Sequence, residues 1–179
     1  MVAYLLVLIA VLTRVLPHTA WFNFTAVTSG LIYFGARRPW REMLAPLAAL
    51  IAADCFLTTV VYHYSFHWAA YVTTWAWYAG AMALGWILLR ARTSVGRVAA
   101  GALLGPTSFF VVSNYGVWAS GFNGYSHTLA GLWTCYLAAI PFYRNDLVAT
   151  SIVLAAAFGV PALARQMSLI PAKVAVTNK

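Results

Sequence analysis

The sequence has few charged residues: Asp, Glu, Lys and Arg make up only 8% of its 179 residues, and only three residues are acidic. Soluble domains carry about 25% charged residues. Because 63% of this chain is hydrophobic, the composition excludes an ordinary soluble domain and predicts an all-α, polytopic membrane protein. Three acids and four histidines form no specific Ser-His-Asp or paired-carboxylate pattern, so we expect no enzymatic activity.

Cysteine is also scarce. Cys55 and Cys135 lie in apolar segments without C-x-x-C spacing, and they indicate no redox compartment. The first apolar segment has no basic residues before it and no small-residue cleavage pattern, so we interpret it as a retained membrane helix. The net charge of +8 comes from basic residues at the ends of apolar segments. That distribution follows the positive-inside pattern of membrane proteins and argues against a nucleic-acid partner.

Six apolar segments are predicted to span the membrane: Val2–Leu16, Ala26–Ala36, Met43–Tyr62, Trp68–Leu89, Val98–Trp118 and Leu147–Ala164. A Gly105-Pro106 pair predicts a kinked break in the fifth. Tyr125–Ile140 has only 16 residues before Pro141, whereas a spanning helix needs about 20. We therefore predict a re-entrant helix there, with Asp146 as the N-cap of the next span.

The distribution of basic residues predicts the topology. Six spans and one re-entrant helix leave only Arg14 and Arg144 outside, and place the other basic residues inside: Arg37, Arg38, Arg41, Arg90, Arg92, Arg97, Arg165, Lys173 and Lys179. A seventh span would give a weaker bias of seven inside and four outside, so the positive-inside rule favours six spans. Both termini are then cytoplasmic, with a single transmembrane domain at residues 1–165 and a polar cytoplasmic tail at 166–179.

Asp54 is the most informative candidate for a functional residue. It lies deep in the third span, where an ionised carboxylate costs about 2.5–3.5 kcal/mol and should face a cavity or a polar partner. Arg14, His18 or a bound ligand could be that partner. Alternatively, Asp54 is protonated or hydrogen-bonded between helices and only holds the bundle together.

The other polar candidates each have a structural alternative. His63 and His67 have a metal-ligand spacing if their segment is helical, but the surrounding aromatic residues also fit an interface belt. His127 could line a cavity. Asn114 and Trp118 could hydrogen-bond to and stack on a ligand, or anchor the membrane interface. No metal site is assigned.

Several motifs carry a resemblance to a known family. They are Arg14-Val-Leu-Pro-His18, Asn23-Phe-Thr25, the run Phe109 to Trp118, Tyr125-Ser-His-Thr-Leu-Ala-Gly131 and the run Cys135 to Asn145. With these motifs the chain resembles a family of small bacterial membrane proteins that has no assigned activity. The match covers nearly the whole chain.

The layout is also distantly similar to the S-components of energy-coupling-factor transporters, six-helix proteins that bind vitamins or metal-related micronutrients. Pro141-Phe142 with Asn145-Asp146-Leu147 is similar to a Pro-Phe…Gly-Asp-Leu segment near their ligand. Their first helix commonly carries an Ala-x-x-x-Ala face for the coupling subunit, whereas this one offers only Ala3 and Ala10. The protein could therefore act with a coupling subunit or on its own.

We therefore expect a substrate-binding protein of the bacterial inner membrane that takes up a small micronutrient. The expected ligand-binding residues are His18, Asn23, Asp54, His63, His67, Asn114, Trp118, Tyr125, His127, Arg144 and Asp146. Arg144 and the histidines favour an anionic or metal-bearing ligand, and the sequence indicates no cofactor. The alternatives are an accessory subunit of a larger membrane complex and an enzyme or haem-binding anchor that uses His18 and His127.

Overall fold

The computed structural model describes residues 1–15, 24–121 and 124–177, with side chains up to residue 168. These residues form six α-helices joined by loops, which confirms the all-α fold class. The helices are α1 (Val2–Val15), α2 (Val27–Arg37), α3 (Leu44–Phe56), α4 (Val72–Leu89), α5 (Val95–Ser120) and α6 (Leu129–Thr177). Three short helices accompany them: 3-10 helices at Trp40–Met43 and Trp68–Ala70, and a π-helix at Leu57–Val61.

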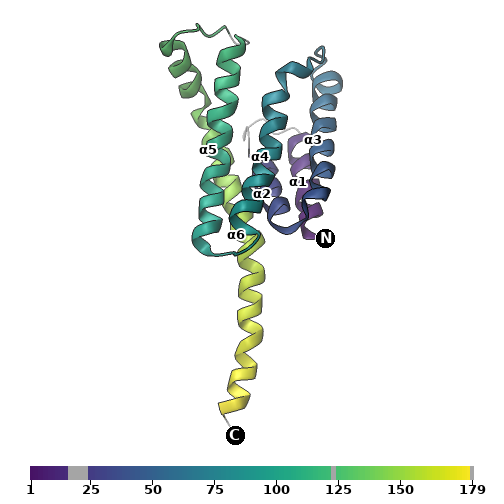
Figure 1. The fold of residues 1–179 in the computed structure, drawn as a ribbon, viewed down its shortest axis with the longest axis vertical. Coiled ribbons are helices and arrows are strands. Elements are labelled where there is room, and N and C mark those ends of the chain that lie inside the picture. Colours follow the sequence, from purple (N-terminus) through teal and green to yellow (C-terminus); the bar gives the residue numbers. More distant parts are fainter. Residues whose placement is uncertain (16–23, 122–123, 178–179) are drawn as a thin grey trace.

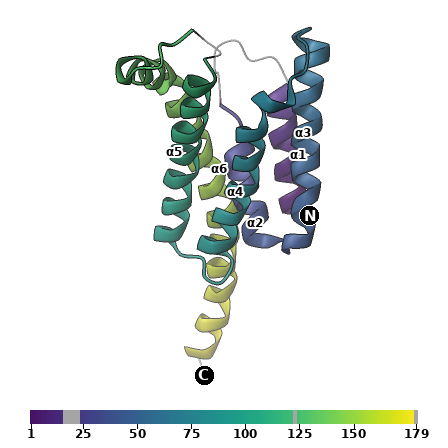
Figure 2. The same ribbon diagram turned by 45° about the horizontal axis from the view of Figure 1, so that its top comes forward.

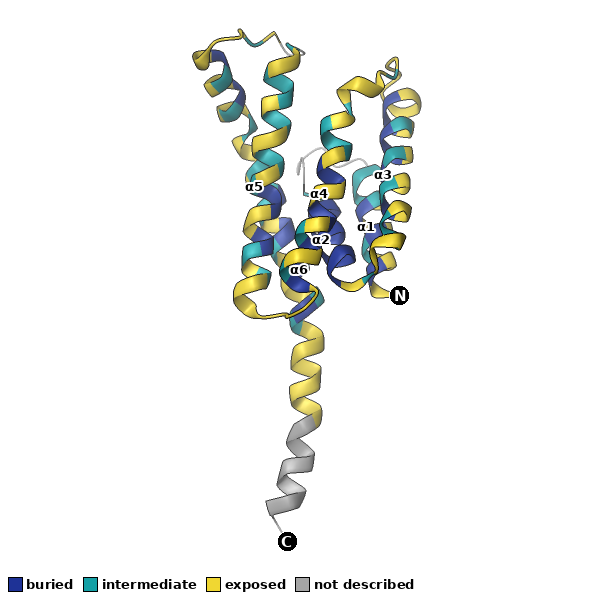
Figure 3. Cartoon of the chain, in the orientation of Figure 1, coloured by how far each residue is buried: buried dark blue, intermediate teal, exposed yellow. Residues whose placement is uncertain are grey.

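Helix α2 lies at the centre of the bundle (Figure 1). Its residues from Val27 to Ala36 are all buried, and it contacts α1, α4, α5 and α6. Figure 3 shows that the buried residues gather around it, whereas the outer helices are largely exposed. A helix of 11 residues is about 16 Å long, roughly half the membrane's hydrocarbon thickness. The segment predicted as a second span is therefore a core helix enclosed by the others.

Two glycines set the distance between α2 and α4. A Cβ built on Gly35 would lie 1.9 Å from the carbonyl oxygen of Met82, and one on Gly85 would lie 2.0 Å from that of Ile32. Each glycine thus faces the backbone of the other helix. Small residues at such positions let helices in membranes approach closely. No larger residue fits here without moving the helices apart.

Four helical segments are long and apolar enough to cross a membrane: Trp40–Val61, Val72–Leu89, Val95–Ser120 and Leu129–Ser168. Helix α1 is apolar but shorter. The first five predicted spans overlap α1 to α5, whereas the predicted re-entrant helix and last span are both parts of α6, and the predicted count of six spans plus a re-entrant helix is not confirmed. The apolar helices indicate that the chain is associated with a lipid bilayer.

Basic side chains gather at one end of the bundle. The N-terminus, the α2–α3 connection and the α4–α5 loop all lie at this end, beyond which the last part of α6 projects (Figure 1). Arg38 is paired with Glu42 at 2.5 Å, and the Arg90 guanidinium donates to the carbonyl of Arg38 at 2.8 Å. Arg37 lies 4.8 Å from the ring centroid of Phe158 in α6. These contacts tie four elements together at the basic end.

Neither Pro106 nor Pro141 ends its helix. Helix α5 runs through Pro106, and α6 runs through Pro141 without ending. Proline removes one backbone donor, but membrane helices tolerate it because hydroxyl groups and neighbouring helices satisfy the freed backbone groups. In α5 the hydroxyls of Thr107 and Ser108 donate to carbonyls of the preceding turn. Figure 2 shows the first turns of α6 inclined to the remainder of the helix.

The continuity of α6 corrects the prediction for Asp146. A residue 17 positions past the start of a helix cannot be its N-cap, because the backbone N–H groups that follow it already donate within the helix. The Asp146 carboxylate instead points toward α2, where it meets Thr28. Residues 166–177, predicted as part of a tail, continue the same helix.

Candidate functional site: two buried aspartates and a cavity

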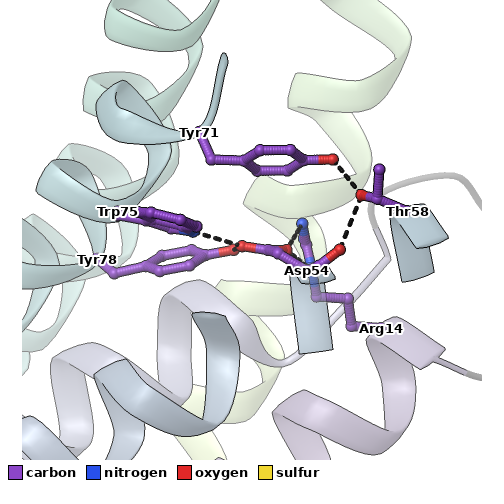
Figure 4. A network of polar contacts seen from close by, with 6 residues as sticks. All are labelled: Arg14, Asp54, Thr58, Tyr71, Trp75 and Tyr78. Carbon is purple, nitrogen blue, oxygen red and sulfur yellow. Dashed lines mark hydrogen bonds and ion pairs between the residues drawn. The ribbon is translucent and has the colours of Figure 1, made fainter. Parts of the chain in front are cut away.

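Asp54 is the centre of a polar network that joins three helices (Figure 4). Its side chain is fully buried, and its Oδ1 accepts from Nε and Nη2 of Arg14 in α1, at 2.9 and 2.5 Å. Its Oδ2 accepts from Nε1 of Trp75 at 3.0 Å and from the hydroxyl of Tyr78 at 3.3 Å, both in α4. The carboxylate therefore has a charged partner and four hydrogen bonds.

The network continues toward the end of α3. The Thr58 hydroxyl donates to the backbone carbonyl of Asp54 at 2.8 Å. Because its proton is used there, the Thr58 oxygen accepts from the Tyr71 hydroxyl at 2.5 Å. The Tyr71 ring stacks on the rings of Phe66 and Trp75, with centroids 5.2 and 5.9 Å away, and those two rings are 6.2 Å from each other. Thr58 belongs to the π-helix that follows α3, an irregularity frequently found at functional sites.

The geometry confirms that Asp54 faces a polar partner, and it identifies that partner as Arg14. A buried ion pair costs desolvation energy, which is recovered only where further hydrogen bonds satisfy the remaining groups. Here Trp75 and Tyr78 provide those bonds. Asp54 is therefore held in one position by fixed partners and has no lone pair directed at open space. This arrangement fits a role in holding α1, α3 and α4 together.

Asp146 is buried as deeply as Asp54 but has different partners. It is only 5% exposed, and it accepts from the Thr28 hydroxyl at 2.9 and 3.0 Å and from the Thr150 hydroxyl at 3.1 Å. No ion pair joins it to any basic side chain among the described residues. Two neutral hydroxyl groups therefore hold a buried carboxyl group that has no counter-charge.

A cavity of about 190 Å³ lies between α5 and α6 beside Asp146. Its walls come from those two helices alone: Pro106, Phe109, Phe110, Ser113, Asn114, Ala139, Phe142, Tyr143 and Asp146. A second space of about 20 Å³ lies on the other side of Asp146 and Phe109, bordered by Arg14, Thr28 and Tyr78 among others. Asp146 thus stands between a ligand-sized cavity and a space that leads toward the Asp54 network.

The walls of the larger cavity are fixed by contacts between α5 and α6. The ring of Phe110 packs on the rings of Tyr136 and Tyr143, whose centroids lie 5.2 and 4.8 Å from its own. The hydroxyl of Tyr143 bonds to that of Thr107 at 2.9 Å, and the Tyr136 hydroxyl donates to the Val111 carbonyl at 2.8 Å. These interactions keep the two helices together while leaving a space between them.

The predicted site residues are spread over the molecule. Asn114 and Asp146 both line the larger cavity, whereas Asp54 lies in the separate network. Trp118 and His127 are neighbours, with ring centroids 5.6 Å apart, near the end of α5. Tyr125 is half-buried in the same connection. His18 and Asn23 lie outside the described residues.

The two loop histidines do not have the helical spacing that a metal site would use. Residues 63–67 form an extended loop, and both His63 and His67 are exposed. His67 Nδ1 bonds to the Ser65 carbonyl at 2.9 Å. Within the described part of the chain, no three His, Cys, Asp or Glu side chains lie close enough to hold a metal ion.

Arg144 lies on the outer side of α6, away from Asp146. It is exposed and is not among the residues that line the cavity. The same helix face carries exposed apolar side chains: Trp133, Leu137, Ile140 and Val148. An exposed guanidinium in the middle of an apolar face is an unusual feature.

Several residues that form these sites are not among those predicted from the sequence. Tyr71, Trp75 and Tyr78 share one face of the fourth predicted span, at spacings of four and three residues, and this pattern could have marked them as partners of Asp54. The Asp146–Thr150 spacing of four carries the same signal once α6 is known to be continuous. Nothing in the sequence pairs Thr28 with Asp146, which is 118 positions away.

Together, the fold and these sites define an all-helical membrane protein with two buried carboxyl groups and a partly open cavity between α5 and α6. The chain belongs to a family of unknown function, DUF6580, whose model matches residues 1–173. No curated protein and no solved structure matches the chain.

Proposed function

We propose that the protein binds a small molecule within the membrane, in the cavity between α5 and α6, with Asp146 as the polar anchor. The observation that carries this proposal is a buried carboxyl group without a counter-charge that borders a cavity of about 190 Å³. Ionisable residues inside membrane segments are costly, and they commonly mark ligand or ion pathways. Asp54 has its own cation, whereas Asp146 has none among the described side chains.

The shape and lining of the cavity support this function. Ligand sites are concave and mostly apolar, with a few polar groups that fix the orientation of the bound molecule. Phe109, Phe110 and Phe142 supply apolar surface, and Asn114 and Asp146 supply polar atoms. An engineered cavity of about 150 Å³ in another protein holds benzene, so a space of this size accommodates a ligand somewhat larger than one ring.

The finer proposal is uptake of a small micronutrient across a bacterial inner membrane, in the manner of an S-component. The basic end of the bundle, which includes both the N-terminus and the last part of α6, would then be cytoplasmic, as the positive-inside rule requires. Ala3 and Ala10 of α1 are buried within the bundle. A coupling subunit would therefore have to contact another helix, and the exposed small residues of α3 offer the alternative: Ala45, Ala48, Ala49 and Ala52.

Native mass spectrometry of the gently purified protein tests the binding function. We expect a co-purified small molecule on the wild-type chain and on Ala138→Phe, and its loss from Ala139→Phe. Ala139 lines the cavity, so a phenyl group there occupies the space, whereas the neighbouring Ala138 is exposed and serves as a matched control. Equal retention by both folded variants would exclude this cavity as the binding site.

A second candidate function, an accessory subunit of a larger membrane complex, is favoured by Arg144. A charge facing lipid costs about 2.5–3.5 kcal/mol at mid-membrane, so a carboxylate from a partner helix would stabilise it. The chain has only three acids, and Glu42, Asp54 and Asp146 all have partners of their own. Glu42 is bonded to Arg38, and Asp54 and Asp146 are buried, so a second copy supplies no accessible, unpaired carboxylate side chain. In the same mass spectra, a protein partner that is lost on Arg144→Leu would support this candidate.

A further inference from the structure

We propose that the ligand of the α5–α6 cavity is a small organic cation, an ammonium or amidinium group on an aromatic or apolar body. This inference rests on the proposed binding function and adds the charge of the ligand. It differs from the anionic ligand that Arg144 and the histidines favoured in the sequence, because Arg144, His63, His67 and His127 do not line the cavity.

The charge of the cavity wall has one sign. Among the nine lining residues the only ionisable group besides the Tyr143 phenol is the Asp146 carboxyl, and no Lys, Arg or His is present. Arg14 borders the smaller space on the far side of Asp146. Its Nε and Nη2 both donate to Asp54, so its charge is already neutralised. A cation in the larger cavity would therefore meet an anion without a competing positive charge.

The hydroxyl protons at the cavity wall are already used. Ser113 donates to the Phe109 carbonyl at 2.6 Å, and the Asn114 amide uses one of its two Nδ2 protons for the Phe110 carbonyl at 2.7 Å. The Thr107 hydroxyl donates to the Leu103 carbonyl at 2.6 Å, so the Tyr143 proton is directed at Thr107. The oxygen atoms of these groups keep acceptor capacity. The wall therefore suits a ligand that donates hydrogen bonds, as an ammonium does.

The aromatic rings that line the cavity also favour a cation. Phe109, Phe110, Phe142 and Tyr143 all line the cavity. The face of an aromatic ring attracts a cation within about 6 Å of its centroid, and this attraction strengthens where water is excluded. A carboxylate combined with several rings is a favourable environment for an organic ammonium group. It gives an anionic ligand only repulsion from Asp146.

A charge series on one molecular frame tests the inference with the full chain in lipid nanodiscs. The probes are benzylammonium, benzyl alcohol and benzoate, which are similar in size and differ in charge. By calorimetric titration at pH 7 we expect benzylammonium to bind at least tenfold more tightly than benzyl alcohol, and benzoate to show no binding. This comparison needs no variant, so it does not depend on how any substitution affects folding.

Two variants then assign the preference to Asp146. Asp146→Asn should remove the tenfold preference for benzylammonium over benzyl alcohol, because it removes the charge and nearly keeps the shape. Glu42→Gln makes the same chemical change at the basic end and should leave the preference unchanged. Equal binding of benzylammonium and benzyl alcohol to the wild-type protein, or a preference that survives in Asp146→Asn, overturns the inference.

The failure of this inference differs from a failure of the binding function. If benzylammonium does not bind but Ala139→Phe still loses a co-purified molecule, the cation is rejected and the cavity remains the binding site. If benzylammonium binds equally to Ala139→Phe and to the wild-type protein, the probe lies elsewhere and the cation assignment is rejected as well. Tighter binding of benzoate would reject it directly.

Discussion

Asp54 and Asp146 are both buried within one helical bundle, yet their surroundings differ in every respect that matters for function. Asp54 has a guanidinium and two further side-chain donors on its carboxylate and borders neither of the two spaces described above. Asp146 accepts hydrogen bonds from two threonine hydroxyls, and it borders both the larger cavity and the smaller space. Burial alone therefore does not identify a functional carboxyl group. The partners and the adjoining space distinguish a structural role from a binding role.

Helix α2 connects the two regions. Through Thr28 it supplies a hydroxyl to Asp146, and through Gly35 and Ile32 it packs against α4, which carries Trp75 and Tyr78 of the Asp54 network. A rigid central helix gives both aspartates fixed surroundings.

Removing the cation of Asp54 should have the largest effect on stability. Arg14→Met leaves a buried carboxylate uncompensated, which costs about 3–5 kcal/mol in the free energy of unfolding. The double variant Arg14→Met/Asp54→Leu removes both charges and should recover most of that loss, because apolar replacements of a buried ion pair are often neutral. Thermal unfolding of both variants in the same detergent measures the difference. A double variant no more stable than Arg14→Met would show that the pair is not the source of the loss.

Adding a methyl group between α2 and α4 should have the next largest effect. In Gly85→Ala the new Cβ would lie 2.0 Å from the Ile32 carbonyl oxygen, so the helices must move apart. Overpacking of this kind typically costs about 1–3 kcal/mol. Because α2 serves both regions, we expect lower thermal stability together with weaker benzylammonium binding.

Gly80→Ala is the matched control for that change. Gly80 is in the same helix, and a Cβ built on it meets nothing within 4 Å. It should unfold at the wild-type temperature or slightly above, because alanine is favoured over glycine within a helix. Equal melting temperatures for the Gly85 and Gly80 variants would refute close contact between the helix backbones.

Much of the fold could be predicted from the sequence, because apolar runs and basic ends mark helices well. The segments Val2–Leu16 and Trp68–Leu89 agree closely with α1 and α4. Pro141 predicts the end of a helix in the sequence, whereas α6 passes through it in the structure. The sequence also predicted a span where α2 lies, because composition does not distinguish a helix buried in protein from one buried in lipid.

The candidate site could be predicted only in part. The cost of a charge at mid-membrane singled out Asp54, with Arg14, His18 or a ligand as possible partners, and the geometry identifies Arg14. The cavity could not be foreseen, because it depends on how Phe110 and Tyr143 pack between α5 and α6. The bond between Thr28 and Asp146 likewise depends on the tertiary fold and has no local pattern in the sequence.

The most direct test of the division between the two aspartates compares Asp54→Asn with Asp146→Asn in the same nanodiscs. For each variant, thermal unfolding and a benzylammonium titration are measured together. We expect Asp146→Asn to change the free energy of unfolding by less than about 1.5 kcal/mol, since only hydroxyl hydrogen bonds are affected, and to lose the cation preference. Asp54→Asn should lose about 3 kcal/mol or more while its folded fraction keeps that preference. If Asp146→Asn is the less stable variant and still prefers benzylammonium to benzyl alcohol, the assignment of the two roles is wrong.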